Sequence, residues 1–441
     1  MPVPTHLHRV TTGAPCNLSR RRMLGWALVA GSAPLLSACG SGGSDVTINT
    51  GGGNSASAWA DDIQTFAANI RSVHPDPNGI TRGAEWQNLL SQITANAART
   101  SDKANLVACM RLAALMRDEH TQVSIAAAGL AQAAIRFATA TDGYWVQQAS
   151  DTGLLGARLL AIDGIPIAEV KTRIKAIIPA ATAAAYDNLT SPLLHQVELL
   201  SLAGICPSTA QASYQLRDTT GLERAVTLQA GGNPTLNNIY GRAGGPAAPL
   251  WLSQIDKNYF MSTLPGSQSI YVRYARCAAD PALPINTFFN GIDQALAALP
   301  APRLVFDLRN NPGGDSSLLA NAILQRGNGN PAAPTPRIAV LVNNGVYSSA
   351  TINLYDLRKL GARTFGESPG TAPNHTGELR TFALPRTGTQ HTSSTRIFSL
   401  DPALGAANYV PDVVIGPTID DRVNGRDPIL DRAELYLRTG E

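Results

Sequence analysis

Apolar side chains recur every three or four residues, the spacing of an α-helix, through the stretch 58–117. The three stripes are formed by Trp59, Ile63, Phe66 and Ile70, by Trp86, Leu90 and Ile93, and by Leu106, Met110 and Ala113. Between the first two stripes, HPDPNG (74–79) contains the Pro and Gly residues that interrupt helices. We therefore expect a small helical subdomain over residues 58–128.

From about residue 130 to 230 the pattern changes to short strands and turns, as in GYWVQQ, ASYQLRD and RAVTLQA. An alanine-rich stretch at 178–205 predicts a helical insertion. In GARLLAIDGIPIAEV (156–170) an apolar strand meets an Asp-Gly turn and a second short strand. This stretch resembles the strand-turn-strand of PDZ domains, which bind peptide carboxyl termini at a sheet edge. The pattern favours a PDZ-like domain with a helical insertion over 129–235, although a generic hairpin has the same local sequence.

Strand and helix patterns alternate from residue 268 onward. The strands SIYVRYA, RLVFDL, RIAVLVN and ARTFG are separated by the helical segments INTFFNGIDQALAALP, SSLLANAILQR and SSATINLYDLRKL. Strands joined by helices imply parallel pairing with crossover connections. We expect an α/β core over residues 236–441, which ends in a strand-rich tail and the final helix PILDRAELYL.

The N-terminus has the features of an export signal. The segment SRRRMLGWALVAGSAPLLSAC places an arginine cluster before a short apolar stretch and small residues that end at Cys39. Its Arg-Arg pair resembles a twin-arginine signal, and LSAC resembles a lipoprotein cleavage box. We expect residues 1–38 to be removed, Cys39 to be lipidated and the Gly/Ser-rich residues 39–57 to form a flexible spacer. The chain is then an exported bacterial lipoprotein on the periplasmic side of a membrane, which it contacts only through its anchor. In an ordinary secretory signal, the alternative, Cys39 is incidental.

The charge balance excludes a nucleic-acid-binding protein. The formal net charge of +3 comes from the N-terminal segment, because the rest of the chain has 31 basic and 32 acidic residues. No basic stripe for phosphates remains. The sequence contains no HExxH or paired-Cys spacing and no Walker or dinucleotide pattern, so we expect neither a metal nor a cofactor. Of the remaining cysteines, Cys109, Cys206 and Cys277, one pair is available for oxidation outside the cytoplasm.

Two strand-to-helix junctions carry candidate chemistry, because ligands gather where strands end in such sheets. In RLVFDLRNNPGGD (303–315) a buried strand runs into Gly313 and Gly314, which leave backbone N–H groups unobstructed. In RIAVLVNNGVYSSATINLYDLRKL the strand is followed by Ser348 near a helix start, where free N–H groups and the helix dipole favour an anion. The first pattern is also that of an ordinary turn, and the second that of an N-cap serine.

Together the two junctions resemble the C-terminal processing (tail-specific) serine peptidases. The likeness rests on VFDLRNNPGG, VLVNNGVYSSATI and GARTFGESPG in this order, and on YVPDVVIGPTIDDRVNGRDPIL near the end. It implies an α/β fold with a Clp-protease/crotonase-like core, a PDZ-like domain and an N-terminal helical subdomain. It also implies that Ser348 is the nucleophile and that the N–H of Ser349 forms an oxyanion hole with Gly313 or Gly314. Ser349 remains the alternative nucleophile.

The sequence departs from this family at the general base. The best-known members pair the serine with a lysine that follows a Gly-Glu step, but here that loop reads GESPGTAPNHTGE (366–378). The last lysine of the chain, Lys359, lies three helical turns after Ser348 and cannot reach it. Histidine is the side chain best matched to general-base catalysis near neutral pH.

Two histidines are candidates for this base. His120, in RDEHT, resembles a histidine that tricorn-type relatives bring from the helical region, with Asp118 or Glu119 to orient it. His375 lies in the loop that otherwise provides the lysine, with Glu378 nearby. We expect His120 to be the base.

The resulting hypothesis is an exported serine peptidase that hydrolyses peptide bonds near the C-termini of peptide or protein substrates. The alternative is a catalytically silent relative that binds peptides or a hydrophobic ligand. The sequence leaves the oligomeric state open.

Overall fold

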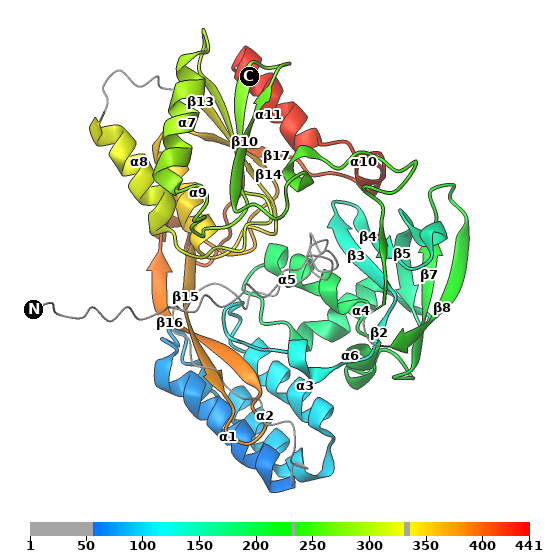
Figure 1. Ribbon diagram of the computed structural model, residues 1–441. Helices are drawn as coiled ribbons and strands as arrows, with labels where there is room; N and C mark the ends of the chain where they lie inside the picture. Colours follow the sequence, from blue (N-terminus) through cyan, green and yellow to red (C-terminus); the bar gives the residue numbers. More distant parts are fainter. Residues whose placement is uncertain (1–55, 232–233, 330–335) are drawn as a thin grey trace, which may run out of the picture.

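The computed structural model describes residues 56–231, 234–329 and 336–441 (Figure 1). The predicted export signal, Cys39 and nearly all of the predicted spacer lie outside these residues. Within them, the first helix begins at Ala56, two residues before the predicted start of the helical subdomain. No helix of the described residues is long and apolar enough to cross a bilayer.

The N-terminal region consists of three helices, α1 (Ala56–Val73), α2 (Ala84–Asn96) and α3 (Asp102–Ala114). The apolar stripes read from the sequence are their buried faces, which confirms this part of the prediction. In α1, for example, Ile63, Phe66 and Ile70 are completely buried.

A second unit is built on an antiparallel sheet with the strand order β2-β8-β7-β5-β4-β3. Its strands are β2 (Gln132–Ala133), β3 (Ile135–Ala140), β4 (Gly143–Ala149), β5 (Arg158–Ile162), β7 (Gln211–Arg217) and β8 (Glu223–Gly231), with β6 (Ile165–Pro166) beside β5 and β9 (Asn237–Asn238) beside β4. The predicted Asp-Gly turn joins β5 to β6, and both of its residues, Asp163 and Gly164, have positive φ angles. The helices are α4 (Ile167–Ile174), α5 (Ala183–Thr190) and α6 (Val197–Leu202), and the last two lie in the predicted helical insertion.

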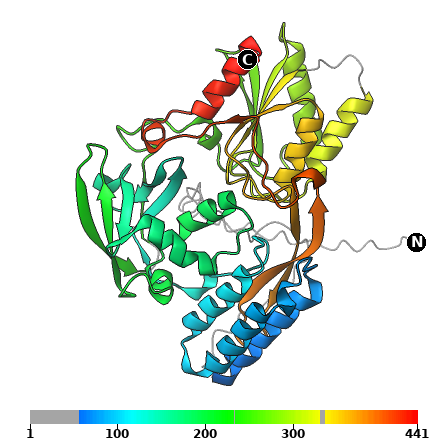
Figure 2. The same ribbon diagram turned by 180° about the vertical axis from the view of Figure 1, so that it is seen from behind.

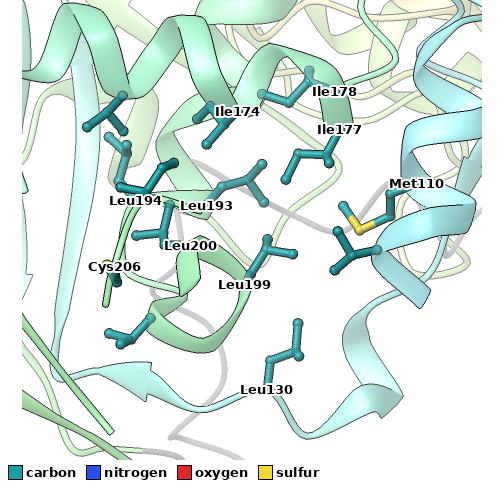
Figure 3. Packing of buried hydrophobic residues seen from close by; sticks show 14 of the residues in the cluster. Met110, Leu130, Ile174, Ile177, Ile178, Leu193, Leu194, Leu199, Leu200 and Cys206 are labelled. Atoms are coloured by element: carbon teal, nitrogen blue, oxygen red, sulfur yellow. The ribbon is translucent and has the colours of Figure 1, made fainter. Parts of the chain in front are cut away.

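These first two units share one continuous hydrophobic cluster. Met110 of α3 packs on the side where α4 and α6 contribute Ile174 and Leu199 (Figure 3). Such shared burial fixes the orientation of the helical region against the sheet, because separating the two would expose apolar surface to water. The predicted general base, at the end of the helical region, is therefore placed by the sheet unit as well.

The C-terminal core is a six-stranded sheet with the order β10-β11-β12-β13-β14-β17. Its strands are β10 (Tyr259–Leu264), β11 (Ser269–Tyr274), β12 (Arg303–Asp307), β13 (Arg337–Val342), β14 (Arg363–Gly366) and β17 (Val413–Val414). All pairs from β11 onward are parallel, as the alternating pattern predicts, and β10 is antiparallel to β11.

Helices cover both faces of this sheet (Figure 1). One face carries α7 (Ile285–Ala297), α8 (Ser317–Gly329) and α9 (Ser349–Lys359), and the other carries α11 (Pro428–Thr439), which follows the short helix α10 (Ile419–Val423). With both faces covered, the strands are buried as continuous apolar runs. The predicted strand and helix types of the core are thus confirmed.

A long hairpin links the core to the N-terminal helices. It consists of β15 (Asn374–Ala383) and β16 (Gln390–Ser399), and in both views it extends from the core to α1 (Figure 1 and Figure 2). At its far end β16 pairs with β1 (Gln122–Val123), which directly follows the DEHT motif. The hairpin therefore joins segments that lie more than 250 residues apart in the sequence.

Candidate active site

The junction after β13 holds Ser348 in a conformation that is unusual for a residue with a side chain. Its φ is 51° and its ψ is −126°, and it stands at the N-cap position of α9. The hydroxyl makes no capping hydrogen bond, so the ordinary reason for a serine at a helix start does not apply. Strained backbone of this kind persists only where surrounding contacts enforce it, and it is concentrated at functional sites. A sharp strand-to-helix turn that exposes a serine hydroxyl is the geometry of a nucleophile elbow.

Surrounding hydrogen bonds enforce this conformation. The N–H of Tyr347 donates to the carbonyl of Asn311, at 2.9 Å. On the other side of the elbow, the N–H of Ser348 donates to Thr371 Oγ1, at 3.1 Å, and the N–H of Gly370 donates to the carbonyl of Val346, at 3.0 Å.

The two serines of the elbow are in different states. Ser349 is buried, and its Oγ donates to the carbonyl of Gly314 at 2.6 Å, so its hydroxyl already has a structural bond. Ser348 is partly exposed, and none of the described hydrogen bonds uses its Oγ. The geometry therefore favours Ser348 over Ser349 as the nucleophile.

The paired glycines lie directly against this elbow. Gly313 has a φ of 98°, and a Cβ atom added to it would stand 2.8 Å from the Cβ of Ser348. Gly314 has a φ of 131°, and an added Cβ would stand 2.2 Å from the carbonyl oxygen of Cys277. A backbone bridge fixes the turn, because the N–H of Cys277 donates to Gly313 O at 3.0 Å and the N–H of Asp315 donates to Cys277 O at 2.7 Å. Only glycine fits at these two positions.

The backbone N–H groups near Ser348 differ in what they contact. The N–H of Gly313 donates to Asn311 Oδ1 at 2.9 Å, in a local turn. In the described part of the chain, the N–H groups of Gly314 and Ser349 have no hydrogen-bond acceptor. Both are therefore available to a developing oxyanion, and the N-terminus of α9 adds a favourable dipole. Of the two predicted glycines, Gly314 thus has the free N–H donor, while Gly313 lacks a side chain that would collide with Ser348.

A buried carboxylate, that of Asp118, contacts His120. Asp118 Oδ1 lies 3.4 Å from His120 Nδ1 and accepts from the backbone N–H of His120 at 3.0 Å. Asp118 Oδ2 accepts from Thr121 Oγ1 at 2.6 Å and from Ser394 Oγ at 2.7 Å, and it lies 3.1 Å from His74 Nε2. Because His74 Nδ1 accepts from the N–H of Asp76, its Nε2 carries the proton that is donated to Asp118.

These contacts set the protonation of the pair. Burial by itself raises the pKa of Asp118, but its interactions with His120 and His74 outweigh this and hold the pKa well below the usual value. For His120, burial lowers the pKa, but the interaction with Asp118, together with the charge of Glu119, outweighs burial and raises the pKa. His120 thus has a pKa above the ordinary 6.5 and a carboxylate that orients its ring.

His375, the second candidate base, lies in a different environment from the one predicted. It stands on β15, opposite Phe398, and the loop predicted over 366–378 ends where this strand begins. Its ring stacks between Phe398, at a centroid distance of 5.1 Å, and His120, at 5.9 Å. Both ring nitrogens are buried without a hydrogen-bond partner, and burial lowers the pKa to about 4. No carboxylate orients His375, so its geometry suits a base less well than that of His120.

Glu378, a predicted site residue because it lies near His375 in the sequence, makes no described side-chain contact with either candidate base. Glu378 is exposed on β15 with a φ of 61°, and only its carbonyl makes a described hydrogen bond, which it accepts from Thr395 Oγ1. Strand alternation and the exposed end of the hairpin turn its side chain to solvent. Asp118 takes the orienting position. The buried Glu119 instead accepts from the N–H of Ala181, at 3.3 Å, ahead of α5.

The segment Thr371–His375 connects the two halves of the site. Thr371 receives the hydrogen bond from Ser348, and His375 stacks on His120. Among the described hydrogen bonds, none joins Ser348 Oγ to either histidine. Lys359 lies at the far end of α9, exposed and paired with Asp356, as helix geometry predicts.

Sequence reasoning missed the hydroxyl groups that support the site. Thr371 bonds the backbone of Ser348, and Ser394 bonds Asp118 from the far strand of the hairpin. Neither residue has a local motif, because each acts through a contact that only the folded chain creates. The described cysteines, Cys109, Cys206 and Cys277, are all free and buried, so none of the pairs left open by the sequence forms a disulfide.

Comparison with known proteins identifies the fold. No protein-family model matches the sequence, and neither does any curated protein. Among solved structures, mature CPAF complexed with lactacystin matches with a TM-score of 0.60 and 15% identity, over 88% of this chain and 99% of that chain. This chain has the fold of CPAF. Another structure of mature CPAF gives a TM-score of 0.59 at 16% identity, over 88% of this chain and 98% of that chain.

A photosystem II D1 C-terminal processing protease also matches, with a TM-score of 0.42 and 14% identity over 84% of this chain and 98% of that chain. The likeness to CPAF extends over the helical region, the sheet unit and the core, and it confirms the fold class predicted from the sequence.

Substituting Gly313 by alanine tests the contact with Ser348. The added Cβ would displace Ser348, so we expect the rate of labelling by a fluorophosphonate to fall by about two orders of magnitude, as when an oxyanion site is disrupted. Gly361→Ala is the matched control, because Gly361 also has a positive φ (81°) but an added Cβ meets nothing within 4 Å. Equal labelling rates in the two variants would contradict the assigned geometry.

The pH dependence of labelling tests Asp118. A base must be neutral, so the labelling rate of the wild type should fall as the pH drops through the raised pKa of His120. In Asp118→Asn the charge that raises this pKa is gone, so the fall should move to lower pH and the maximal rate should decrease. Ser394→Ala removes one bond to Asp118 without changing charge and should leave the midpoint nearly in place. An unchanged midpoint in Asp118→Asn would exclude His120 as the titrating base.

Proposed function

We propose that this protein is an exported serine peptidase that hydrolyses peptide bonds through an acyl-enzyme, near the C-termini of its substrates. The observation that carries the proposal is the uncapped, strained Ser348, packed against Gly313 and beside two free backbone N–H groups. This arrangement supplies a nucleophile and an oxyanion site in one place. The fold shared with CPAF and the order of the sequence motifs support the same reading.

The residues divide the reaction between them. Ser348 Oγ attacks the scissile carbonyl carbon while His120 accepts the hydroxyl proton, and the carbonyl electrons move to oxygen, where the N–H groups of Gly314 and Ser349 bind the charge. The C–N bond then breaks, and His120 returns the proton to the leaving amine. Water attacks the ester with His120 again as base, and Ser348 is regenerated. Asp118 holds the ring and stabilises its charged form.

The serine and the histidine must come together for this reaction. Catalytic hydrogen bonds are often long in free enzymes and shorten when substrate binds. The segment Thr371–His375 contacts the serine at one end and the histidine at the other.

The second candidate function is peptide binding without catalysis. Two observations favour it: no described hydrogen bond joins Ser348 Oγ to a base, and the sequence has no lysine after Lys359. The two functions differ in a single chemical property, the reactivity of Ser348.

Labelling by a fluorophosphonate, with the adduct mapped by mass spectrometry, separates the two functions. We expect an adduct on Ser348 that is retained in Ser349→Ala and lost in Ser348→Ala and His120→Ala. His375→Ala should retain labelling, because burial lowers the pKa of His375 to about 4, which makes it a weak proton acceptor, and no carboxylate orients its ring. Absence of an adduct in the folded wild type would establish the silent alternative. If His375→Ala lost the labelling and His120→Ala retained it, His375 would be the base in place of His120.

We also propose that Cys39 is lipidated after export. The support is the sequence alone, in which an arginine cluster, an apolar stretch and LSAC stand in the order of a lipoprotein signal. In a bacterial host, the wild type should fractionate with membranes, and Cys39→Ser should be exported without a lipid and leave the membrane fraction. Cys16→Ser, which alters a cysteine ahead of the arginine cluster, is the control. Equal membrane association of all three proteins would exclude Cys39 as the anchor.

A further inference from the structure

A cavity lies between the sheet unit and the core, beside the catalytic elbow. Its walls include Trp145 of β4, Asn188 of α5 and Arg422 of α10, together with Trp251, which precedes β10. On the core side it is closed by residues that follow β12 and β13, among them Asn343. The cavity is not part of the oxyanion site, and the reaction described above does not use it.

Polar contacts connect this cavity to the turn that precedes Ser348. Asn188 Nδ2 donates to Asn344 Oδ1 at 3.3 Å, and Tyr347 Oη donates to Asn188 Oδ1 at 3.1 Å. Asn188 thus lines the cavity with part of its surface and touches the two residues on either side of Gly345 and Val346 in the elbow. A group bound in the cavity therefore lies beside the backbone that carries the nucleophile.

The cavity walls contain hydrogen-bond donors that have no acceptor. Trp145 and Trp251 are 1% and 6% exposed, and the indole N–H of each is buried without a partner. A buried N–H without an acceptor is unfavourable, so each indole holds a donor that is available to an acceptor on a ligand. The guanidinium of Arg422 is partly buried, and none of the described hydrogen bonds or ion pairs involves it.

The charges around the cavity leave Arg422 without a dedicated counter-ion. Arg309, whose guanidinium also lies over the Trp251 ring, is paired with Asp307 and with Asp427. These two carboxylates are therefore already engaged. Glu367 interacts with Arg422 at longer range, but burial raises the pKa of Glu367 and so favours its neutral form.

A third arginine, Arg273, also lies near the indole ring of Trp251. Arg273 lies 5.9 Å from the Trp251 ring centroid, next to Arg309 at 5.3 Å and Arg422 at 5.6 Å. Arg273 Nε donates to the carbonyl of Trp251 and Arg273 Nη1 to the carbonyl of Asp307. Of the three arginines, only Arg422 lines the cavity, and no described side-chain hydrogen bond engages its guanidinium.

We propose that this cavity is a subsite that binds a carboxylate of the peptide substrate. A carboxylate presents two acceptor oxygens in a plane, which match the fork of one guanidinium and the indole N–H groups of Trp145 and Trp251. The inference rests on the proposed function, because it uses the position of the cavity beside Ser348. The carboxylate belongs either to the C-terminus of the peptide or to an Asp or Glu side chain, and the two sources share this chemistry.

Calorimetric titration of full-length Ser348→Ala with short peptides tests the proposal without turnover. The probes are N-acetyl tetra-alanine with a free C-terminal carboxylate, its C-terminal amide, and the same amide with glutamate as the last residue. We expect at least one of the two acidic peptides to bind about tenfold or more tightly than the neutral amide, the effect of a charge-assisted hydrogen bond. The acidic peptide that binds identifies the source of the carboxylate.

Substitutions in the same background identify the donors. Arg422→Gln should abolish the preference for the acidic peptide, and Trp251→Phe, which removes the N–H but keeps a ring against the arginines, should reduce it several-fold. Arg426→Gln is the matched control, because Arg426 is exposed four residues later and pairs with Asp420 and Asp421. Thermal unfolding of each variant checks that it is folded, and Arg422→Lys, which keeps the charge but not the fork, should retain part of the preference.

Three outcomes would overturn the subsite: equal binding of acidic and neutral peptides, an unchanged preference in Arg422→Gln, or no binding of any peptide. Equal binding, or no binding, is the result expected of a cavity that holds only water, and an unchanged preference in Arg422→Gln would mean that the carboxylate binds elsewhere. Failure of the proposed function has a different signature. In that case fluorophosphonate would not label the wild type at Ser348, while carboxylate-dependent binding to the cavity would persist. Labelling at Ser348 without any carboxylate preference would remove the subsite and leave the peptidase.

Discussion

The buried carboxylate of Asp118 is the interaction on which the site depends. It contacts His74 from the end of α1, His120 and Thr121 from its own segment, and Ser394 from the C-terminal hairpin. A carboxylate removed from water is stable only when its oxygens are fully hydrogen-bonded. These partners come from segments far apart in the sequence, so the chain must fold completely before the charge is satisfied. The orientation of His120 is thus coupled to the docking of the hairpin.

The serine half of the site depends on a different constraint, close packing around the elbow. Ser348 has a positive φ because the N–H of the preceding Tyr347 donates to Asn311 and its own N–H donates to Thr371. Gly313 permits the approach, since any side chain there would collide with the Cβ of Ser348. Strain of this kind is tolerated at functional sites because the surrounding structure compensates for it. Hydrogen bonding and packing together keep the Ser348 hydroxyl from capping α9, the helix that follows it.

Much of the fold follows from local patterns. The helices of the N-terminal region and the alternating strands and helices of the core are where periodicity predicts them, because each buries one continuous apolar face. The prediction failed where local sequence resembles a loop. The stretch around His375 contains Pro and Gly, yet it becomes a strand because β16 pairs with it. Glu378 was assigned by proximity in the sequence, and strand geometry points it to solvent.

The sequence by itself determined the residue types that carry the chemistry: a serine after a buried strand, a pair of glycines after the neighbouring strand, and histidines in place of a lysine. These are recognisable because backbone conformation at a junction is governed by a few adjacent residues. The tertiary structure decided which serine hydroxyl is free, which N–H groups lack acceptors and which carboxylate orients His120. Those properties arise from contacts between distant segments, since burial and hydrogen-bond partners exist only once the hairpin, the sheet unit and the core have packed together.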